Sequence, residues 1–136
     1  MEAVSQTGVF LPIEGNALLE RRSHKRFELR EGVIASLHPT VIGEALNISR
    51  CGLAFQYVAS RDRSAEGSVL TILTTDHTFT LGMIPVEVVR DVPMPESFTT
   101  GAISLRSCGL KFGHLEDYQE FALRYFIRNY GRGRIP

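Results

Sequence analysis

The chain has 136 residues, of which 43% are hydrophobic, and its 15 Lys and Arg residues equal its 15 Asp and Glu residues in number. This length suits one domain with a core of its own. The balanced charge argues against a general polyanion binder, and no apolar run approaches the roughly 20 residues of a membrane-spanning helix. The start lacks a basic region followed by an apolar region, so we predict a cytoplasmic protein that is neither secreted nor bound to a membrane.

The charge is unevenly placed along the chain. Residues 21–30 carry five Lys or Arg residues and one acid, and residues 124–136 carry four arginines and no acid. Guanidinium groups bind phosphate in bidentate fashion and stack on purine bases. A phosphate-binding site at one of these two basic islands is therefore compatible with the zero net charge of the whole chain. The alternative is a solvated charged surface that only keeps the protein soluble.

Most of the chain is predicted to form short strands. Segments rich in β-branched and aromatic residues alternate with turn residues, and Pro85 inside one of them indicates an edge or a bulge. The predicted strands are residues 32–37, 41–48, 53–58, 68–75, 78–92 and 99–112. Because no helical pattern separates them, they favour a mainly β fold, a six-stranded antiparallel barrel or sandwich, over a βαβ fold.

Helical periodicity is confined to the C-terminal part, residues 116–129. Acids occupy the first turn of this segment, where the helix dipole stabilises them, and Gly131 follows where a C-cap belongs. Its predicted apolar stripe consists of Phe121, Leu123, Tyr125, Phe126 and Ile127. The predicted organisation is an N-terminal arm at 1–19, in which 9–13 resembles an edge strand and 16–22 a helical turn, a domain at 20–130 and a basic tail at 131–136.

A five-residue pattern occurs twice, as Cys51-Gly52-Leu53-Ala54-Phe55 and as Cys108-Gly109-Leu110-Lys111-Phe112. We interpret it as a glycine bend that enters a strand twice, since nothing around the two copies repeats; a duplicated ancestor is the alternative. Two cysteines are too few for a disulfide framework. We expect both to be free, buried thiols.

None of the histidines or acidic residues belongs to a recognisable catalytic sequence motif. The four histidines, His24, His38, His77 and His114, stand singly, and the chain has no nucleophile elbow, zinc-binding helix or phosphate-binding loop. Asp117 and Glu120 need no explanation beyond the helix dipole. We therefore predict no enzyme, no catalytic residue and no metal site.

Two short runs carry the candidate binding residues. The first is a basic stretch, residues 21–26, and the second is a small polar turn, residues 47–52. Asn and Ser side chains can end a strand with local turns and satisfy a polar ligand, and a glycine lets another group approach the backbone closely. The candidate residues are Arg21, Arg22, Arg26, Asn47, Ser49 and Gly52.

Taken together, Arg22-x-x-x-Arg26 and Asn47-x-Ser49-x-x-Gly52 resemble the PilZ domain, a family that binds cyclic di-GMP. The resemblance covers about residues 20–129 and includes Gly-Leu-Lys-Phe before the helix. It implies a split six-stranded barrel whose arginines contact phosphate and guanine, with Asn47 and Ser49 holding the ligand and Gly52 leaving room for it. Asn47 stands where Asp is commoner, and Cys51 where glycine is frequent.

The resemblance also implies how such a receptor signals. No cofactor is expected beyond the ligand, which orders the arginine stretch and so controls a protein partner. Arg21 implies two intercalated cyclic di-GMP molecules per chain, because a third guanidinium can cap a stack of four guanines. The downstream process, whether motility, surface polysaccharide, transcription or virulence, is left open.

Two alternatives to a cyclic di-GMP receptor remain. One is a PilZ-like fold that has lost ligand binding and serves as a docking module. The other is a small barrel that binds single-stranded nucleic acid. Against the second, no strand interleaves aromatic residues for base stacking with basic residues, and the net charge is zero.

Overall fold

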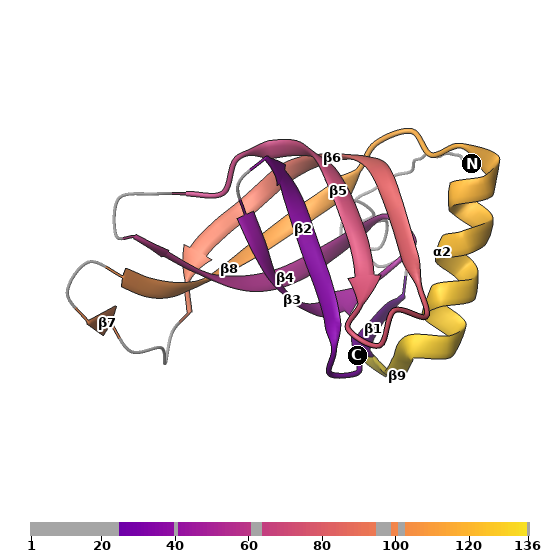
Figure 1. The fold of residues 1–136 in the computed structure, drawn as a ribbon, viewed down its shortest axis with the longest axis horizontal. Coiled ribbons are helices and arrows are strands. Elements are labelled where there is room, and N and C mark those ends of the chain that lie inside the picture. The colour runs from indigo at the N-terminus through magenta and orange to yellow at the C-terminus, as the bar shows by residue number, and fades with distance from the viewer. Residues whose placement is uncertain (1–24, 40, 61–63, 95–98, 101–102, 136) are drawn as a thin grey trace, which may run out of the picture.

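Strands make up most of the computed structural model, which describes residues 25–39, 41–60, 64–94, 99–100 and 103–135. The predicted arm, with its edge strand and helical turn, lies outside the described residues. Nine strands and one helix are described (Figure 1). They are β1 (Arg26–Leu29), β2 (Val33–Pro39), β3 (Val41–Ile48), β4 (Gly52–Ser60), β5 (Gly67–Thr74), β6 (Thr80–Pro93), β7 (Thr99–Thr100), β8 (Ile103–Phe112), α2 (Asp117–Tyr130) and β9 (Gly131–Ile135).

Six of these strands close into an antiparallel barrel, as the sequence predicted. The neighbour order is β2-β5-β6-β8-β4-β3, and β2 also pairs with β3, so the sheet returns to its start. Closure leaves no open strand edge within the barrel. The helix α2 stands at one end of the barrel, and the short β7 pairs with β8 at the other (Figure 1).

Strands β1 and β9 add a flap that the sequence did not indicate. β1 pairs with the last residues of β3, and β9 pairs with the free edge of β1. The stretch named a basic tail thus forms a strand over Gly131–Ile135. Its two glycines have low β propensity, so this segment is extended because it pairs with β1 and not because of local preference.

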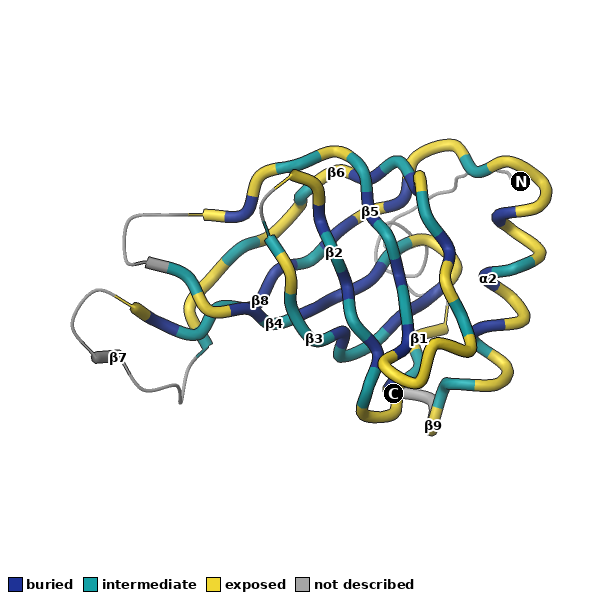
Figure 2. Tube along the Cα trace, in the orientation of Figure 1, coloured by how far each residue is buried: buried dark blue, intermediate teal, exposed yellow. Residues whose placement is uncertain are grey.

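The core fills the barrel interior. Leu53, Phe55 and Tyr57 alternate along β4 with residues that face outward, and Leu70 and Ile72 on β5 are completely buried. Figure 2 shows the same alternation of buried and less buried positions along the barrel strands. This period of two is what a sheet covered on one face requires.

A bulge in β3 sets the direction of a candidate residue. Ala45 pairs with Phe55 and Asn47 pairs with Ala54, so β3 has one extra residue, Leu46, against β4. The bulge resets the alternation, since Ala45 and Ile48 are both in the core while Asn47 between them is only half-buried. Bulges commonly re-aim a side chain in this way.

The bulge that Pro85 indicated is also present. Between the pairs Leu70 with Ile84 and Ile72 with Leu81, β6 advances three residues where β5 advances two. Met83 lies in this bulge with a φ of 57°. β6 pairs with β5 up to Pro85 and with β8 beyond it. Pro85 therefore lies where β6 changes its partner strand, and the N–H that proline lacks is tolerated there.

The helix packs on the barrel through a face that differs from the predicted one. Its buried residues are Gln119, Leu123 and Phe126, whereas Phe121 and Tyr125, both assigned to the apolar stripe, are 68% and 54% exposed. The amide of Gln119 donates to the carbonyls of residues 82 and 83 in the β6 bulge, at 3.2 and 3.0 Å. A polar residue, Gln119, thus holds the helix on the barrel, and a prediction based on apolar positions alone does not find such a contact.

The helix limits agree with the prediction to within one residue. Glu116 and Gln119 form a capping box, acids occupy the first turn, and Gly131 is the C-cap. Phe126 lies against Phe79 and Tyr130, with ring centroids 4.6 and 4.8 Å away. These aromatic contacts attach the C-terminal half of α2 to the end of the barrel.

The two copies of the five-residue pattern pair with each other across β4 and β8. Leu53 lies opposite Leu110, and Phe55 lies opposite Cys108. Both cysteines are free, as predicted, but Cys51 is exposed and only Cys108 is buried. Cys51 precedes β4 in a turn, where no strand alternation directs it inward, and the prediction of a buried thiol was wrong there. Burial raises the pKa of the Cys108 thiol to about 12.

Candidate ligand-binding site

The fold brings together two candidate residues that are 21 positions apart. Glu28 of β1 pairs with Asn47 of β3, which places Arg26 at the same edge. Arg26 Nη1 lies 3.5 Å from Asn47 Oδ1, at the long limit of a hydrogen bond. Both side chains are at least partly exposed. A contact this long leaves both groups able to bind a ligand, because a guanidinium has four further N–H donors.

Ser49 shapes the turn between β3 and β4. Its Oγ accepts from the backbone N–H of Cys51 at 3.1 Å, and its own N–H donates to the carbonyl of Gly52 at 2.9 Å. The predicted serine-type turn is therefore present. Ser49 is only 4% exposed, so its first role is to hold the turn.

Gly52 has a structural reason to be glycine. A Cβ at this position would lie 2.3 Å from the carbonyl oxygen of Leu110 on the neighbouring strand β8. Real Cβ atoms do not approach a carbonyl so closely, so only glycine lets β4 begin beside β8. Room for a ligand is not needed to explain this residue.

A second glycine, Gly109, has no such reason. A Cβ there would make only ordinary contacts, at 3.6 Å to Arg90 and 3.8 Å to Val89. Its φ is not in the left-handed region where glycine is required. The chain thus leaves open surface at Gly109 that neither packing nor backbone conformation demands.

Gly109 belongs to a row of residues on the outer face of the barrel. Cross-strand pairing joins Asn47 to Ala54, Ala54 to Gly109, and Gly109 to Arg90. Ala54 alternates with core residues of β4, Gly109 with core residues of β8, and Arg90 is exposed. We call this row the outer platform. Two small residues form its floor, and Asn47 and Arg90 stand at its two ends.

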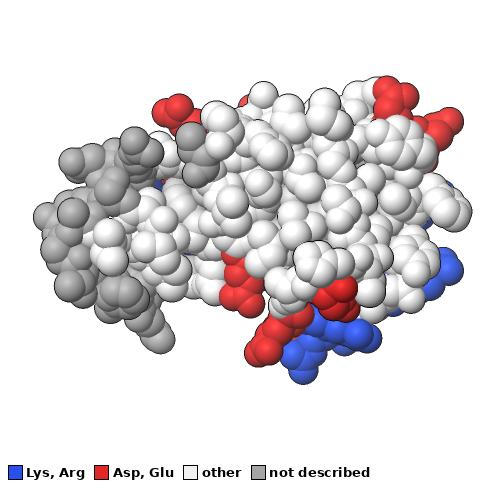
Figure 3. All heavy atoms as spheres, viewed as in Figure 1, with Lys and Arg blue, Asp and Glu red and all other residues white. Residues whose placement is uncertain are grey.

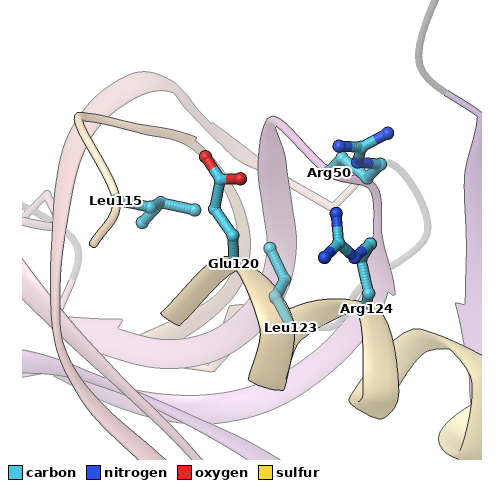
Figure 4. Close-up of a pocket in the computed structure, with 5 residues that line it drawn as sticks. All are labelled: Arg50, Leu115, Glu120, Leu123 and Arg124. Atoms are coloured by element: carbon cyan, nitrogen blue, oxygen red, sulfur yellow. The ribbon is translucent and has the colours of Figure 1, made fainter. Parts of the chain in front are cut away.

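A pocket of about 160 Å³ lies between the turn and the helix (Figure 4). Arg50 lies at the tip of the β3–β4 hairpin, Arg124 of α2 extends toward it, and Glu120 extends from the preceding helical turn (Figure 4). Leu115 and Leu123 complete the lining. Two guanidinium groups beside one carboxylate leave the pocket with a net positive charge suited to an anion.

The two basic islands of the sequence are neighbours in the fold. Arg26 pairs with Ile135, and Phe27 pairs with Arg134, so the start of the domain and its last strand lie side by side (Figure 1). On the face that Figure 3 shows, most of the visible basic side chains lie in the half of the molecule that contains α2. The sheet therefore pairs residues of the two basic islands that lie more than 100 positions apart in the sequence.

Of the six predicted site residues, Arg26, Asn47, Ser49 and Gly52 lie in the described part of the chain and gather at one hairpin. Arg21 and Arg22 lie outside it. Sequence reasoning missed Arg50, Arg90 and Gly109. Arg50 lies inside the predicted turn and Gly109 inside the repeated pattern, so the sequence could have pointed to both as candidate site residues. Nothing in the sequence around Arg90 marks it as one.

Further polar groups are engaged in structural contacts. Asp91 accepts from Tyr57 at 2.7 and 2.8 Å, from the backbone N–H of Ala65 at 2.6 Å and from Arg106 Nε at 3.0 Å. Burial first, and then the hydrogen bond from its hydroxyl to Asp91, raise the pKa of Tyr57 to about 12. This network is complete without a ligand.

Comparisons with known proteins gave no match, whether to protein-family models, to curated proteins or to solved structures. Within the described ranges, no group of three His, Cys, Asp or Glu side chains has a metal-binding arrangement. The described helix is not long and apolar enough to cross a membrane.

Proposed function

We propose that this chain is a cyclic di-GMP receptor of the PilZ type. The observation that carries the proposal is the 3.5 Å approach of Arg26 to Asn47 across the β1–β3 pairing. These residues come from the two separate runs on which the resemblance rests, and the fold could have placed them on different faces. Their meeting beside a half-buried, outward-facing asparagine supports one shared binding site.

The chemistry of the site suits a guanine nucleotide. The amide oxygen of Asn47 can accept from guanine N–H groups, and the guanidinium of Arg26 can donate to phosphate or to guanine O6 and N7. In the outer platform beside them Ala54 is only 7% exposed, whereas Gly109 is partly exposed and has no side chain, so a base can approach the sheet at Gly109. Arg90 at its far end offers a second guanidinium plane for stacking.

The pocket at the hairpin tip adds positive charge to the same site. Arg50 is three residues from Asn47, and Arg124 faces it from α2 (Figure 4). A cyclic dinucleotide carries two phosphates, so a positively charged pocket at the hairpin that also carries Asn47 fits its charge. Through Arg124, ligand charge would act directly on the helix.

Isothermal titration with cyclic di-GMP tests the proposal, with GTP and single-stranded RNA as parallel ligands. We expect cyclic di-GMP to bind and Arg26→Ala to weaken it about ten- to a hundredfold, the equivalent of about 1.5 to 3 kcal/mol for a charged hydrogen bond. Arg30→Ala is the matched control, because Arg30 belongs to the same basic island but lies beyond the other end of β1.

The controls separate the alternatives. Tighter binding of RNA than of cyclic di-GMP would favour a nucleic-acid-binding barrel, and no binding of any of the three would favour a docking module. Equal affinity in Arg26→Ala and the parent would remove Arg26 from the site. The same titration measures stoichiometry, for which we propose two ligands per chain, moving toward one in Arg21→Leu.

A further inference from the structure

The outward side of α2 carries three aromatic rings in a row. Tyr118, Phe121 and Tyr125 are 62%, 68% and 54% exposed. At 100° per residue these positions fall within an arc of about 60° on the helix surface, so the rings form one stripe. The residues that hold α2 on the barrel, Leu123 and Phe126, face the other way. We call this row the aromatic stripe.

Exposed apolar side chains are ordinary when single, but a contiguous row of aromatic rings marks an interaction surface. The stripe residues are mostly exposed, whereas Gln119, Leu123 and Phe126 are the buried residues that hold α2 on the barrel. Tyrosine and phenylalanine are also among the residues enriched at protein interfaces. The stripe is therefore available for a partner.

Charges beside the stripe indicate which partner. Asp117 and Arg128 are both exposed and lie eleven positions apart, which is about three helical turns, so they stand on the same flank of the stripe, with the exposed Arg124 between them and nearer to Arg128. The acid is at the N-terminal end and the base at the C-terminal end. A parallel copy of α2 would place like charges together, and an antiparallel copy would place each acid beside a base.

We propose that α2 pairs with α2 of a second copy of this chain in an antiparallel dimer. A two-fold axis near Phe121 lays Tyr118 against Tyr125 of the second copy and brings Asp117 to Arg128 of the second copy, twice. Such a two-fold interface must be self-complementary, and the order of charges along this flank meets that condition. The inference does not depend on which ligand the barrel binds.

The area available makes this dimer weak. A fully buried aromatic side chain covers about 150 to 250 Å², so three rings at these exposures offer roughly 300 to 450 Å² per copy. A stable interface buries about 800 Å² per partner. We therefore expect weak association that depends on protein concentration.

Sedimentation velocity on the full chain tests the proposal, at protein concentrations from about 10 µM to about 1 mM, where small interfaces associate. The parent protein is expected to sediment faster as concentration rises. Phe121→Ser is expected to weaken the dimer at least about tenfold while its melting temperature stays that of the parent, because Phe121 is exposed. Val89→Ser, which removes an exposed valine of β6, is the control and should dimerise like the parent.

Charge reversal tests the antiparallel geometry. Asp117→Arg and Arg128→Asp each place like charges together at two symmetric contacts and are expected to weaken the dimer about tenfold, more so at low salt. The double variant Asp117→Arg/Arg128→Asp restores opposite charges and should recover the parent affinity. Both changes oppose the helix dipole, so recovery cannot come from a more stable helix. A parent protein that stays monomeric throughout, or a double variant no better than the singles, would overturn the proposal.

Discussion

Arg90 and Asp91 are consecutive residues of β6 with opposite surroundings. Asp91 lies at the barrel wall with its carboxylate held by Tyr57, Arg106 and a backbone N–H, and its side chain is 9% exposed. Arg90 is exposed at the end of the outer platform, and in the described part of the chain no carboxylate pairs with it. Buried charges need partners to be stable, whereas an unpaired charge on the surface costs little and stays available.

Arg90 and Asp91 differ in how many of their polar atoms already have partners. A network whose donors and acceptors are all used, like that of Asp91, maintains the fold. Charged groups gathered around open space, like Arg26, Arg50 and Arg90, have binding capacity left.

The largest effect is expected from Asp91→Ala. It removes the carboxylate that accepts from Arg106 Nε and from Tyr57, and breaking a buried ion pair costs about 3 to 5 kcal/mol. Urea unfolding measures the loss. Arg90→Ala is the control on the adjacent residue and should change stability by less than about 0.5 kcal/mol. Similar losses in the two variants would contradict the contrast.

Alkaline pH should act on the Asp91 network through Tyr57. The pKa of Tyr57 is raised from 10.0 to about 12, so the folded state holds this proton more tightly than the unfolded state. The resulting stability is fully present below pH 10 and is lost as the pH rises from 10 through about 12. The rise of the Tyr57 pKa from 10.0 to about 12 corresponds to about 2.7 kcal/mol of folding stability.

Unfolding free energies measured from pH 9 to pH 12 test this point. In Tyr57→Phe the decline over this range should be smaller, although the variant is less stable at pH 9 because Asp91 loses a donor. Tyr118→Phe, at an exposed tyrosine, should keep the parent slope. Equal slopes for the parent and Tyr57→Phe would show that other groups cause the alkaline loss.

Filling the outer platform should affect binding and not folding. Gly109→Val places a side chain where a Cβ meets only ordinary contacts, and valine suits a strand. We expect cyclic di-GMP affinity to fall at least about tenfold, which is about 1.4 kcal/mol, with no loss of thermal stability. Gly52→Ala is the counterpart and should destabilise the fold, since its Cβ would meet Leu110. Unchanged affinity in Gly109→Val would exclude the platform from the site.

The smallest effects concern the pocket at the hairpin tip. Exposed charges interact by about 0.2 to 1 kcal/mol, so Arg124→Ala should weaken cyclic di-GMP binding two- to about fivefold. Glu120→Gln should strengthen it by a similar factor, because it removes the one carboxylate of the pocket. Titrations at two salt concentrations check both, and changes of the same sign in the two variants would contradict an electrostatic role.

Local sequence determined most of the secondary structure. Residues 41–48 form β3 as predicted, α2 ends one residue from its predicted limit, and Gly131 caps it. Alternating β-branched residues, capping residues and glycine express preferences of the adjacent backbone. The mainly β fold could be predicted because no helix interrupts the strands, but that pattern fits a barrel or a sandwich, and the resemblance to the PilZ domain was needed to expect a barrel.

Tertiary structure alone decided where the candidate site has its surfaces. The β3 bulge at Leu46 turns Asn47 outward, the pairing of β8 with β6 brings Arg90 to the platform, and β9 forms only against β1. The stripe of α2 shows the same limit, since Phe121 and Leu123 are both apolar and only one meets the barrel. Strand register, bulges and the contact face of a helix depend on contacts between residues distant in the chain. A single sequence does not show which distant residues come into contact.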